Sequence, residues 1–484
     1  MKTNILYYGD NLDVLRRHIP DESVDLIYLD PPFNSNATYN VLFAEHGAGS
    51  PAQIKAFGDT WRWDQAAAYD YQATVEAGGQ VADALRAFRT VLGTNDMLAY
   101  LSMMAPRLVE LRRVLRKTGS IYLHCDPTAS HYLKLLMDAV FGVENFRNEI
   151  AWCYRGGGVP RNAFARKHDV LLFYAKGPDS FFKTQYVPYS EASQKLVRSR
   201  GGVSIDEKPR DLKRGAHMPD WWTDINALQT WSPERLGYPT QKPTALLVRI
   251  LEASSRKGAT VLDPFCGCGT TIDAAQRLDR RWIGIDITHL AVGLIKHRLA
   301  DTYGPNIAES YRVIGEPTDL AGARELASED PFQFQAWALG LVGARVAGSD
   351  RKGGDKGIDG RLYFHDEPEG PTKQIIFSVK SGHLVPNYVR DLRGVVDREA
   401  AQIGVLLSFD DPSPGMRAEA ASAGFYDSPW GARHPRLQLL TVGELLGGRG
   451  VDYPNIAGGN VTHRRAERAA PQAPEQGRMF DRDR

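Results

Sequence analysis

The stretch that decides the fold is VLDPFCGCGTTIDAAQRLDRRWIGID, residues 261–286. An apolar strand ends at Asp263, a glycine-containing loop leads into a predicted helix, and a second strand ends at Asp286. Gly267 and Gly269 let the loop backbone approach a ligand closely. A carboxylate at the end of the next strand typically binds ribose hydroxyls. The pattern predicts a β-α-β unit with a ligand site at the carboxyl ends of its strands.

A second acidic strand end lies far upstream, in LDPPF, residues 29–33. Asp30 ends a buried apolar strand, and Pro31 and Pro32 restrict the backbone that follows. Phe33 offers an aromatic face. Taken alone, Asp-Pro-Pro simply ends a strand, and a G-x-G often marks only a tight turn. Because parallel strands end at one edge of a sheet, the two stretches together predict two walls of a single cleft.

Strand and helix patterns alternate around these two stretches and predict the α/β class. The strands are expected at 4–9, 24–30, 120–125, 169–176, 259–263 and 281–286, and the helices at 10–19, 95–117, 243–255 and from about Gly269. This order favours a Rossmann-like, doubly wound parallel sheet with helices on both faces. After about Pro317 a second set begins, with a helix in 331–346 and strands in 357–364, 373–380, 403–409 and 436–442. It predicts a second, smaller α/β domain.

The composition of the chain is that of an ordinary globular protein, with 43% hydrophobic and 24% charged residues among 484. Its 59 Lys and Arg balance 58 Asp and Glu, so any basic surface must be local. Four cysteines are too few for a disulfide framework, and Cys266 and Cys268 suit a tight loop better than a zinc site. No signal pattern or membrane-length apolar run is present, so we expect a cytoplasmic protein without a membrane partner.

The residues of LDPPF suit chemistry on the exocyclic amine of a nucleobase. Such an amine is a poor nucleophile because its lone pair is delocalised into the ring. Hydrogen bonds to the Asp30 carboxylate and the Pro31 carbonyl would return the lone pair to nitrogen and aim it at an electrophilic methyl group. Phe33 would stack on the base, which must leave the duplex to be reached. Asp263 and Asp286 suit a ligand with a cationic amine and a ribose, and S-adenosylmethionine has both.

Seven stretches in one order extend this interpretation to a family resemblance. They are GDNLDVL, SVDLIYLDPPFN, GSIYLHCDPTASHYLKLLMDAVFGVENFRNEI, KHDVLLFYAKG, YPTQKPTALLVRILEASS, VLDPFCGCGTTIDAA and RWIGIDI. Residues 1–317 resemble a DNA amino-methyltransferase of the permuted beta class, in which the catalytic motif precedes the cofactor motif. The resemblance implies S-adenosylmethionine as methyl donor, double-stranded DNA as partner and catalysis by Asp30, Pro31, Pro32 and Phe33. It implies a cofactor pocket formed by Asp10, Lys242, Pro243, Asp263, Phe265, Gly267, Gly269, Thr270 and Asp286.

Two features bear on the target of methylation. Asp rather than Ser at position 30 resembles the adenine-N6 members more than the cytosine-N4 members, and it counts against protein-glutamine methylation, whose enzymes resemble NPPY. The basic segment 177–236 occupies the place of target recognition in such enzymes. Its candidate contacts to phosphates and guanine edges are Lys195, Arg198, Arg200, Lys208, Arg210, Lys213 and Arg214. The alternative is a solvated surface loop with a few core tryptophans.

Residues 325–447 resemble an Mrr-type restriction endonuclease of the PD-(D/E)xK superfamily. Asp359 and Lys380 fall on neighbouring strands, where the carboxylate would hold Mg²⁺ and the lysine would position or activate water. Ser378 stands where the motif has Glu or Gln, so metal binding is weakened or another group substitutes. The helix upstream offers Gln333 and Gln335 where an acidic residue often assists.

The leading hypothesis is a single-chain modification and restriction protein, followed by a polar tail at 448–484 that is predicted to be disordered. No Walker-type motif is present, so the sequence predicts no ATP-driven motor. Cutting both strands of a duplex usually needs two nuclease domains, so an active nuclease would favour a homodimer. The first alternative is an orphan methyltransferase for adenine-N6 or cytosine-N4, whose second domain only binds DNA or a partner. The intact motifs disfavour a DNA-binding protein without catalysis.

Overall fold

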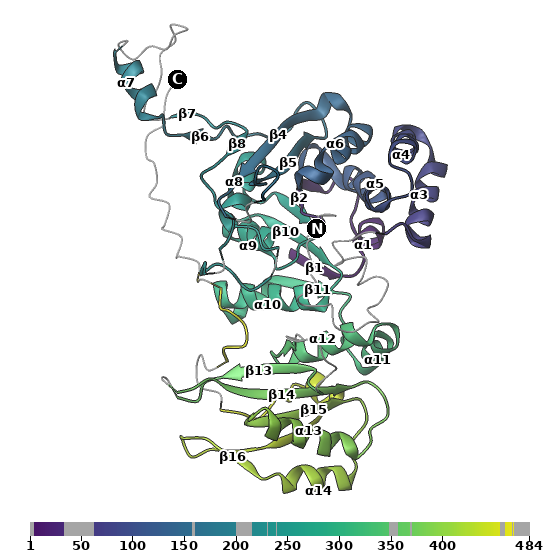
Figure 1. The fold of residues 1–484 in the computed structure, drawn as a ribbon, viewed down its shortest axis with the longest axis vertical. Coiled ribbons are helices and arrows are strands. Elements are labelled where there is room, and N and C mark those ends of the chain that lie inside the picture. Colours follow the sequence, from purple (N-terminus) through teal and green to yellow (C-terminus); the bar gives the residue numbers. More distant parts are fainter. Residues whose placement is uncertain are drawn as a thin grey trace.

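The computed structural model describes residues 4–32, 62–156, 160–199, 215–229, 231–238, 240–347, 357–367, 370–454, 460–466 and 468. Figure 1 shows two α/β units joined through neighbouring helices, with the C-terminal unit in green and yellow. In the described ranges no helix is both long and apolar enough to span a membrane.

In the described ranges the larger sheet has nine strands, and all but one run in the same direction. In spatial order the strands are β11 (Tyr311–Ile314), β1 (Asn4–Tyr8), β10 (Arg281–Asp286), β9 (Thr260–Asp263), β2 (Val24–Leu29), β3 (Leu115–Cys125), β5 (His168–Ala175), β4 (Phe146–Cys153) and β8 (Trp221–Trp222). The prediction of an all-parallel sheet is wrong at one end. There the chain crosses to β4 and returns in β5, which lies antiparallel to both β3 and β4.

Helices cover both faces of this sheet, which confirms the doubly wound arrangement. One face buries α1 (Asn11–His18), α3 (Gln65–Ala77), α4 (Gly79–Leu92), α5 (Asp96–Val114) and α6 (Pro127–Phe141). The other face buries α8 (Thr244–Ser254), α9 (Thr270–Arg277) and α10 (His289–Tyr303). The predicted helix at 95–117 is α5, which continues through Pro106. The short 3-10 helices η2 (Val143–Asn145) and η3 (Pro305–Ser310) connect elements at the rim.

Strand register brings the two acidic motifs together. β2 pairs with β9 so that Ile27 lies opposite Leu262, and β9 pairs with β10 so that Asp263 lies opposite Gly284. The strands are apolar and largely buried before these ends, as expected for parallel strands covered on both faces. The ends of these three adjacent strands consequently lie at the same edge of the sheet, and they carry Asp30, Asp263 and Asp286.

The smaller unit contains a five-stranded sheet in the order β12 (Arg345–Val346), β13 (Gly360–Phe364), β14 (Lys373–Lys380), β15 (Ile403–Ser408) and β18 (Leu437–Thr441). β12, β13 and β14 are antiparallel, whereas β15 and β18 run parallel to β14. The helices are α11 (Leu320–Glu329), α12 (Pro331–Leu341), α13 (Asn387–Arg398), α14 (Pro414–Ser422) and α15 (Val442–Leu446). The four strands predicted after residue 357 are all present.

Small elements complete the described chain. They are β6 (Tyr186–Val187), α7 (Glu191–Ser199) and β7 (Ala216–His217) in the predicted recognition segment, and the hairpin β16 (Phe425–Asp427) and β17 (Arg433–Pro435) in the smaller unit. In the same recognition segment Trp222 is buried, whereas Trp221 and Trp231 are exposed.

Part of the tail at 448–484, which the sequence predicts to be disordered, belongs to the described residues. The backbone N–H of Val461 donates to the Tyr363 carbonyl at 2.9 Å, and that of Ala466 donates to the Asp301 carboxylate at 3.2 Å. Hydrogen bonds to both units hold this segment despite its polar composition. The tail beyond residue 468 lies outside the described residues.

Candidate active site

Three buried or partly buried carboxylates meet at the carboxyl edge of the larger sheet. Burial raises the pKa of Asp263 to about 7, and the nearby charges of Asp30 and Asp286 add to this effect. Burial likewise raises the pKa of Asp286 to about 6. Carboxylates with raised pKa values in one place are a feature of functional sites. This edge therefore favours binding of a group that carries positive charge.

The glycine loop folds directly over Asp263 and Asp286. The backbone N–H of Phe265 donates to Asp263 Oδ1 at 3.0 Å, and that of Gly267 donates to Asp286 Oδ2 at 2.9 Å. Gly267 has a φ of 48°, and a Cβ there would lie 3.1 Å from the ring of Tyr238. The loop thus needs glycine for its backbone conformation and for the close approach of Tyr238.

Tyr238 is a site residue that the sequence analysis missed. Its side chain is almost fully buried, and its pKa is raised by burial and by nearby groups that include Asp286 and Asp30. It therefore lies near both the Asp30 end and the Asp286 end of the carboxylate cluster. Its position at the start of YPTQKP was the only available signal, since a lone tyrosine has no distinctive spacing.

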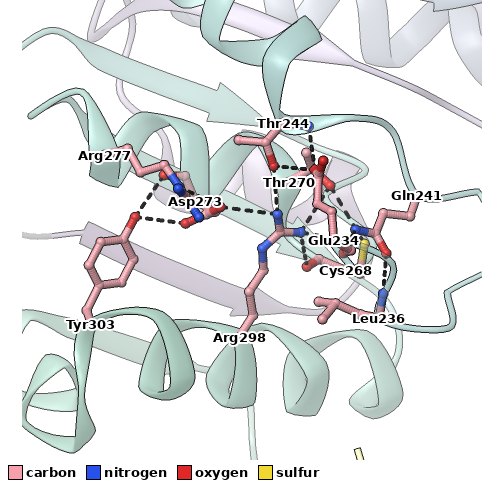
Figure 2. A network of polar contacts seen from close by, with 10 residues as sticks. All are labelled: Glu234, Leu236, Gln241, Thr244, Cys268, Thr270, Asp273, Arg277, Arg298 and Tyr303. Atoms are coloured by element: carbon pink, nitrogen blue, oxygen red, sulfur yellow. Dashed lines mark hydrogen bonds and ion pairs between the residues drawn. The ribbon is translucent and has the colours of Figure 1, made fainter. Parts of the chain in front are cut away.

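A buried arginine network supports the glycine loop from behind (Figure 2). Arg298 of α10 donates to the Thr270 hydroxyl at 3.1 Å and to the Cys268 carbonyl at 3.4 Å. The same guanidinium donates to Asp273 at 3.2 Å and to the Thr244 hydroxyl at 3.1 Å. The sequence predicts Thr270 in the cofactor pocket, and in the structure its hydroxyl accepts a hydrogen bond from Arg298. The network ties α8, α9 and α10 to the loop.

Lys242 lies against the Asp30 carboxylate. Its ammonium donates to Asp30 Oδ2 at 2.6 Å, and the two side chains are only 14% and 15% exposed. The family resemblance implies a place for Lys242 beside the cofactor, whereas the structure pairs it with Asp30. Pro243 follows directly and caps α8, with a φ of −64°. Pro31 is buried and Pro32 is half-buried at the end of β2.

A buried polar chain runs beside this ion pair. The hydroxyl of Tyr28 lies 2.8 Å from Nδ1 of His124, whose Nε2 lies 3.1 Å from Oδ2 of Asp169. The Tyr154 hydroxyl donates to the other oxygen of Asp169 at 3.0 Å. Burial alone would raise the pKa of Asp169, but the His124 hydrogen bond and the charges of His124 and Lys242 lower it. These residues come from separate strands, so sequence spacing gave no signal for them.

Asp10 is already engaged by protein groups. Its Oδ1 accepts the Leu12 N–H at 2.7 Å as the cap of α1, and its Oδ2 accepts from Arg107 at 2.7 Å. The neighbouring Asn11 donates to the Pro264 carbonyl in the loop at 2.8 Å. A contact between Asp10 and a cofactor adenine stays a prediction, and Asn11 is the residue here that holds the loop.

Several predicted site residues lie outside the described part of the chain. They are Phe33 and the recognition residues Arg200, Lys208, Arg210, Lys213 and Arg214, together with the side chain of Arg198. Lys195 lies exposed on α7. The roles of all these residues stay predictions.

In the smaller unit, Asp359 and Lys380 lie together as the sequence predicts. Lys380 Nζ is 3.8 Å from Asp359 Oδ2, which also accepts the Val379 N–H at 2.7 Å. Gln335 approaches the same place and donates to the Asp359 carbonyl at 3.0 Å. Among the described residues, no three His, Cys, Asp or Glu side chains gather in a metal-binding group.

The expectation that Gln333 assists Asp359 is wrong. Gln333 is directed to the other unit, where its Oε1 accepts the backbone N–H of His289 at 3.0 Å. Gln333 and Gln335 are two positions apart, so they point to different sides of α12. Ser378 is buried on β14, where the motif would have a carboxylate or amide.

Comparison with known proteins identifies the larger unit. Residues 24–297 match the family model described as "DNA methylase". The chain is 27% identical over 357 residues to the type II methyltransferase M.EcaI of Enterobacter cloacae, covering 61% of this chain and 69% of that protein. It is 30% identical over 231 residues to the type II methyltransferase M.HpaI of Haemophilus parainfluenzae, covering 47% and 69%.

Two further proteins are similar to this chain. The DNA adenine methyltransferase YhdJ of Escherichia coli strain K12 is 25% identical over 301 residues, with 62% of this chain and 84% of that protein covered. A structure of a protein described as a DNA modification methylase from Thermus thermophilus, complexed with S-adenosyl-L-methionine, is 18% identical. It covers 64% of this chain and 99% of that chain, with a TM-score of 0.36. Since the family model spans more than half of the residues, the chain belongs to the DNA methylase family.

Proposed function

We propose that this chain transfers a methyl group from S-adenosylmethionine to the exocyclic N6 amine of an adenine in double-stranded DNA. The observation that carries the proposal is the convergence of Asp30, Asp263 and Asp286 at one edge of the sheet, beneath a glycine loop. A transfer reaction needs a donor and an acceptor side by side, and this edge offers a carboxylate for each.

The acceptor side is formed by Asp30 and the prolines that follow. Lys242 engages Asp30 Oδ2, which leaves Oδ1 to accept a hydrogen bond from the amine. The Lys242 ammonium also holds the Asp30 carboxylate in place, and a hydrogen bond from the amine to that carboxylate would draw the lone pair back onto the amine nitrogen. The base must be out of the duplex to reach this carboxylate. Phe33 is the residue proposed to stack on it.

The donor side fits S-adenosylmethionine by the chemistry of its residues. Asp263 is buried with its pKa raised by burial and by carboxylate neighbours, so a cationic amine would stabilise its ionised form. Asp286 Oδ1 accepts two hydrogen bonds from Thr288, whereas Oδ2 accepts the Gly267 N–H and keeps a second lone pair for a ribose hydroxyl. S-adenosylmethionine supplies the methyl group from its sulfonium. Asp263, Asp286, Phe265 and the glycine loop would bind and orient it.

The choice of adenine rests on Asp at position 30, and cytosine-N4 is the alternative. The test is to express the chain in cells that lack DNA methylation and to sequence their DNA with long reads that detect modified bases. N6-methyladenine in a defined sequence context supports the proposal, and N4-methylcytosine would overturn the choice of base. Loss of the modification with Asp30→Ala would assign it to this site.

The second candidate function is phosphodiester cleavage by the smaller unit. The order α12, β12, β13, β14, α13, β15 and the 3.8 Å approach of Lys380 to Asp359 favour it. The residues that the structure describes fit Mg²⁺ poorly, however, because no group of three potential ligands surrounds Asp359 and Ser378 replaces the expected ligand. DNA binding without cleavage is the alternative role for this unit.

The two roles are separated by incubating unmethylated DNA with the full chain and Mg²⁺. Cutting that survives Asp30→Ala and is lost with Lys380→Ala would support a nuclease. Intact DNA under all conditions, with binding weakened by Lys380→Ala, would assign the unit to DNA binding and leave the chain a methyltransferase alone.

A further inference from the structure

Helix α10 lies between the proposed cofactor loop and the smaller unit. It begins at His289, three residues after Asp286, and packs against α12 of the smaller unit. Figure 1 shows α12 alongside α10 where the two units meet. Since α10 touches both units, its position affects both.

On one side, α10 determines where the glycine loop lies. Gly269 has a φ of 76°, and a Cβ there would lie 2.7 Å from Ile295 of α10. Arg298, one turn further along α10, donates to Cys268 and Thr270 of the loop (Figure 2). Any shift of α10 must therefore displace the loop that lies over Asp263 and Asp286.

On the other side, the smaller unit caps the first turn of α10. The first N–H groups of a helix have no partner within the helix. Gln333 supplies a partner for one of these groups, because its Oε1 accepts the His289 N–H at 3.0 Å. The Gln333 side chain is buried. The adjacent Thr288 donates its N–H and hydroxyl to Asp286 Oδ1, at 3.0 and 2.9 Å. Gln333 is therefore connected to Asp286, the proposed ribose-binding carboxylate, through only two residues, His289 and Thr288.

Further contacts from both units fix α10. The ring of His289 stacks on Tyr8 of β1, in the larger unit, with centroids 3.7 Å apart. Farther along α10, His297 stacks on His463, and Asp301 accepts the Ala466 N–H. The segment 460–466 is itself bonded to β13 through Val461. The smaller unit and its C-terminal segment thus contact α10 near both ends.

We propose that Gln333 is a positioning residue for the cofactor site, so that docking of the smaller unit on α10 sets the affinity for S-adenosylmethionine. The inference rests on the proposed cofactor. By linkage, the coupling acts in both directions, and bound cofactor must stabilise the docked arrangement by the same factor.

The test is the dissociation constant of S-adenosylmethionine, measured by calorimetry on the full chain without DNA. Gln333→Ala should weaken binding about 5- to 10-fold, because it leaves a helix N–H beside Asp286 without its acceptor. Gln335→Ala is the matched control, since it changes the same side chain on the same helix but faces Asp359. It should stay within about twofold of wild type.

A second variant separates positioning from simple loss of folding. Gln333→Glu keeps an oxygen acceptor at a helix N-terminus and should restore most of the affinity. In wild type, hydrogen–deuterium exchange of α12 and of residues 460–466 should slow when S-adenosylmethionine binds.

Equal affinity of Gln333→Ala and wild type, or equal losses in Gln333→Ala and Gln335→Ala, would overturn the inference and leave the proposed function standing. If the wild-type chain binds no S-adenosylmethionine, the proposed function fails, and the inference fails with it.

Discussion

The carboxyl edge of the larger sheet and the Asp359 site of the smaller unit use acidic groups in opposite ways. At the first, Asp263 and Asp286 are buried close together with raised pKa values, while Asp30 has a lysine counter-ion at 2.6 Å. At the second, the Asp359 carboxylate accepts a backbone N–H and faces Lys380 at 3.8 Å. The first arrangement favours binding of a cationic ligand. At the second, the charge of Asp359 is largely balanced by Lys380 and a backbone N–H of the protein itself.

The largest expected effect is on methyl transfer by Asp30→Ala. Removing the acceptor of the amine hydrogen bond should lower the single-turnover rate by about 10²–10³-fold or more, in line with the loss of a preorganised electrostatic group. Incorporation of labelled methyl groups into unmethylated DNA measures it. Asp359→Ala is the control, and it should leave the transfer rate at the wild-type value. Full activity of Asp30→Ala would contradict the assignment.

A smaller effect is expected for Lys242→Met. Because Lys242 pairs with Asp30, this change should lower kcat by about 10-fold while the affinity for S-adenosylmethionine changes little. Lys242→Arg should recover part of the rate, since it keeps the charge.

Lys176→Met is the matched control for Lys242→Met. Its side chain is equally buried, with 14% exposed, but it lies near Glu22, before the start of β2. If Lys242→Met instead weakens the binding of S-adenosylmethionine and leaves kcat unchanged, Lys242 acts on the cofactor and not on the acceptor.

The raised pKa of Asp263 predicts that cofactor binding depends on pH. Only the ionised carboxylate can pair with a cationic amine, and burial holds its pKa at about 7. Affinity should therefore rise roughly 10-fold or more between about pH 5.5 and about pH 8. Calorimetric titrations across this range measure the change. In Asp263→Asn the affinity should be weaker and should depend less on pH, with only the titration of Asp286 near pH 6 remaining, and an unchanged slope would exclude Asp263 as the titrating group.

The smallest predicted effect is on the stability of the free protein. A carboxyl whose pKa is raised in the folded state favours folding when protonated, so its contribution is complete below about pH 4 and is lost as the pH rises through about 7. Asp263→Asn removes the buried charge and should stabilise the free protein by about 1–3 kcal/mol near pH 8. Near pH 4 it should change stability little. Denaturant unfolding at the two pH values checks this, and equal effects at both would contradict burial as the cause.

The sequence predicted the main elements because their signals are local. The strands that end at Asp30, Asp263 and Asp286 are apolar runs that stop at an acidic residue, and two glycines mark the loop between two of them. The antiparallel return of β5 was missed because strand direction depends on where the chain re-enters the sheet. The order of the strands in space, not their composition, sets that direction.

The supporting residues of the site could not be predicted. His124, Asp169 and Tyr154 come together only through the pairing of β3, β4 and β5. Arg298 was one arginine among many, and its buried position depends on how α10 packs. Gln333 and Gln335 were predicted to share one role, yet helical geometry directs them to different units.

The central claim is that Asp30 serves the acceptor and Asp263 the donor, and cofactor affinity tests it most directly. The measurement is the dissociation constant of S-adenosylmethionine for Asp30→Ala and Asp263→Ala, at about pH 8, above the pKa of Asp263. The account predicts that Asp30→Ala binds about as tightly as wild type, because Asp30 faces the acceptor base and is paired with Lys242. It predicts that Asp263→Ala binds at least about 10-fold more weakly. Equal losses in the two variants would contradict the division of the site into two sides.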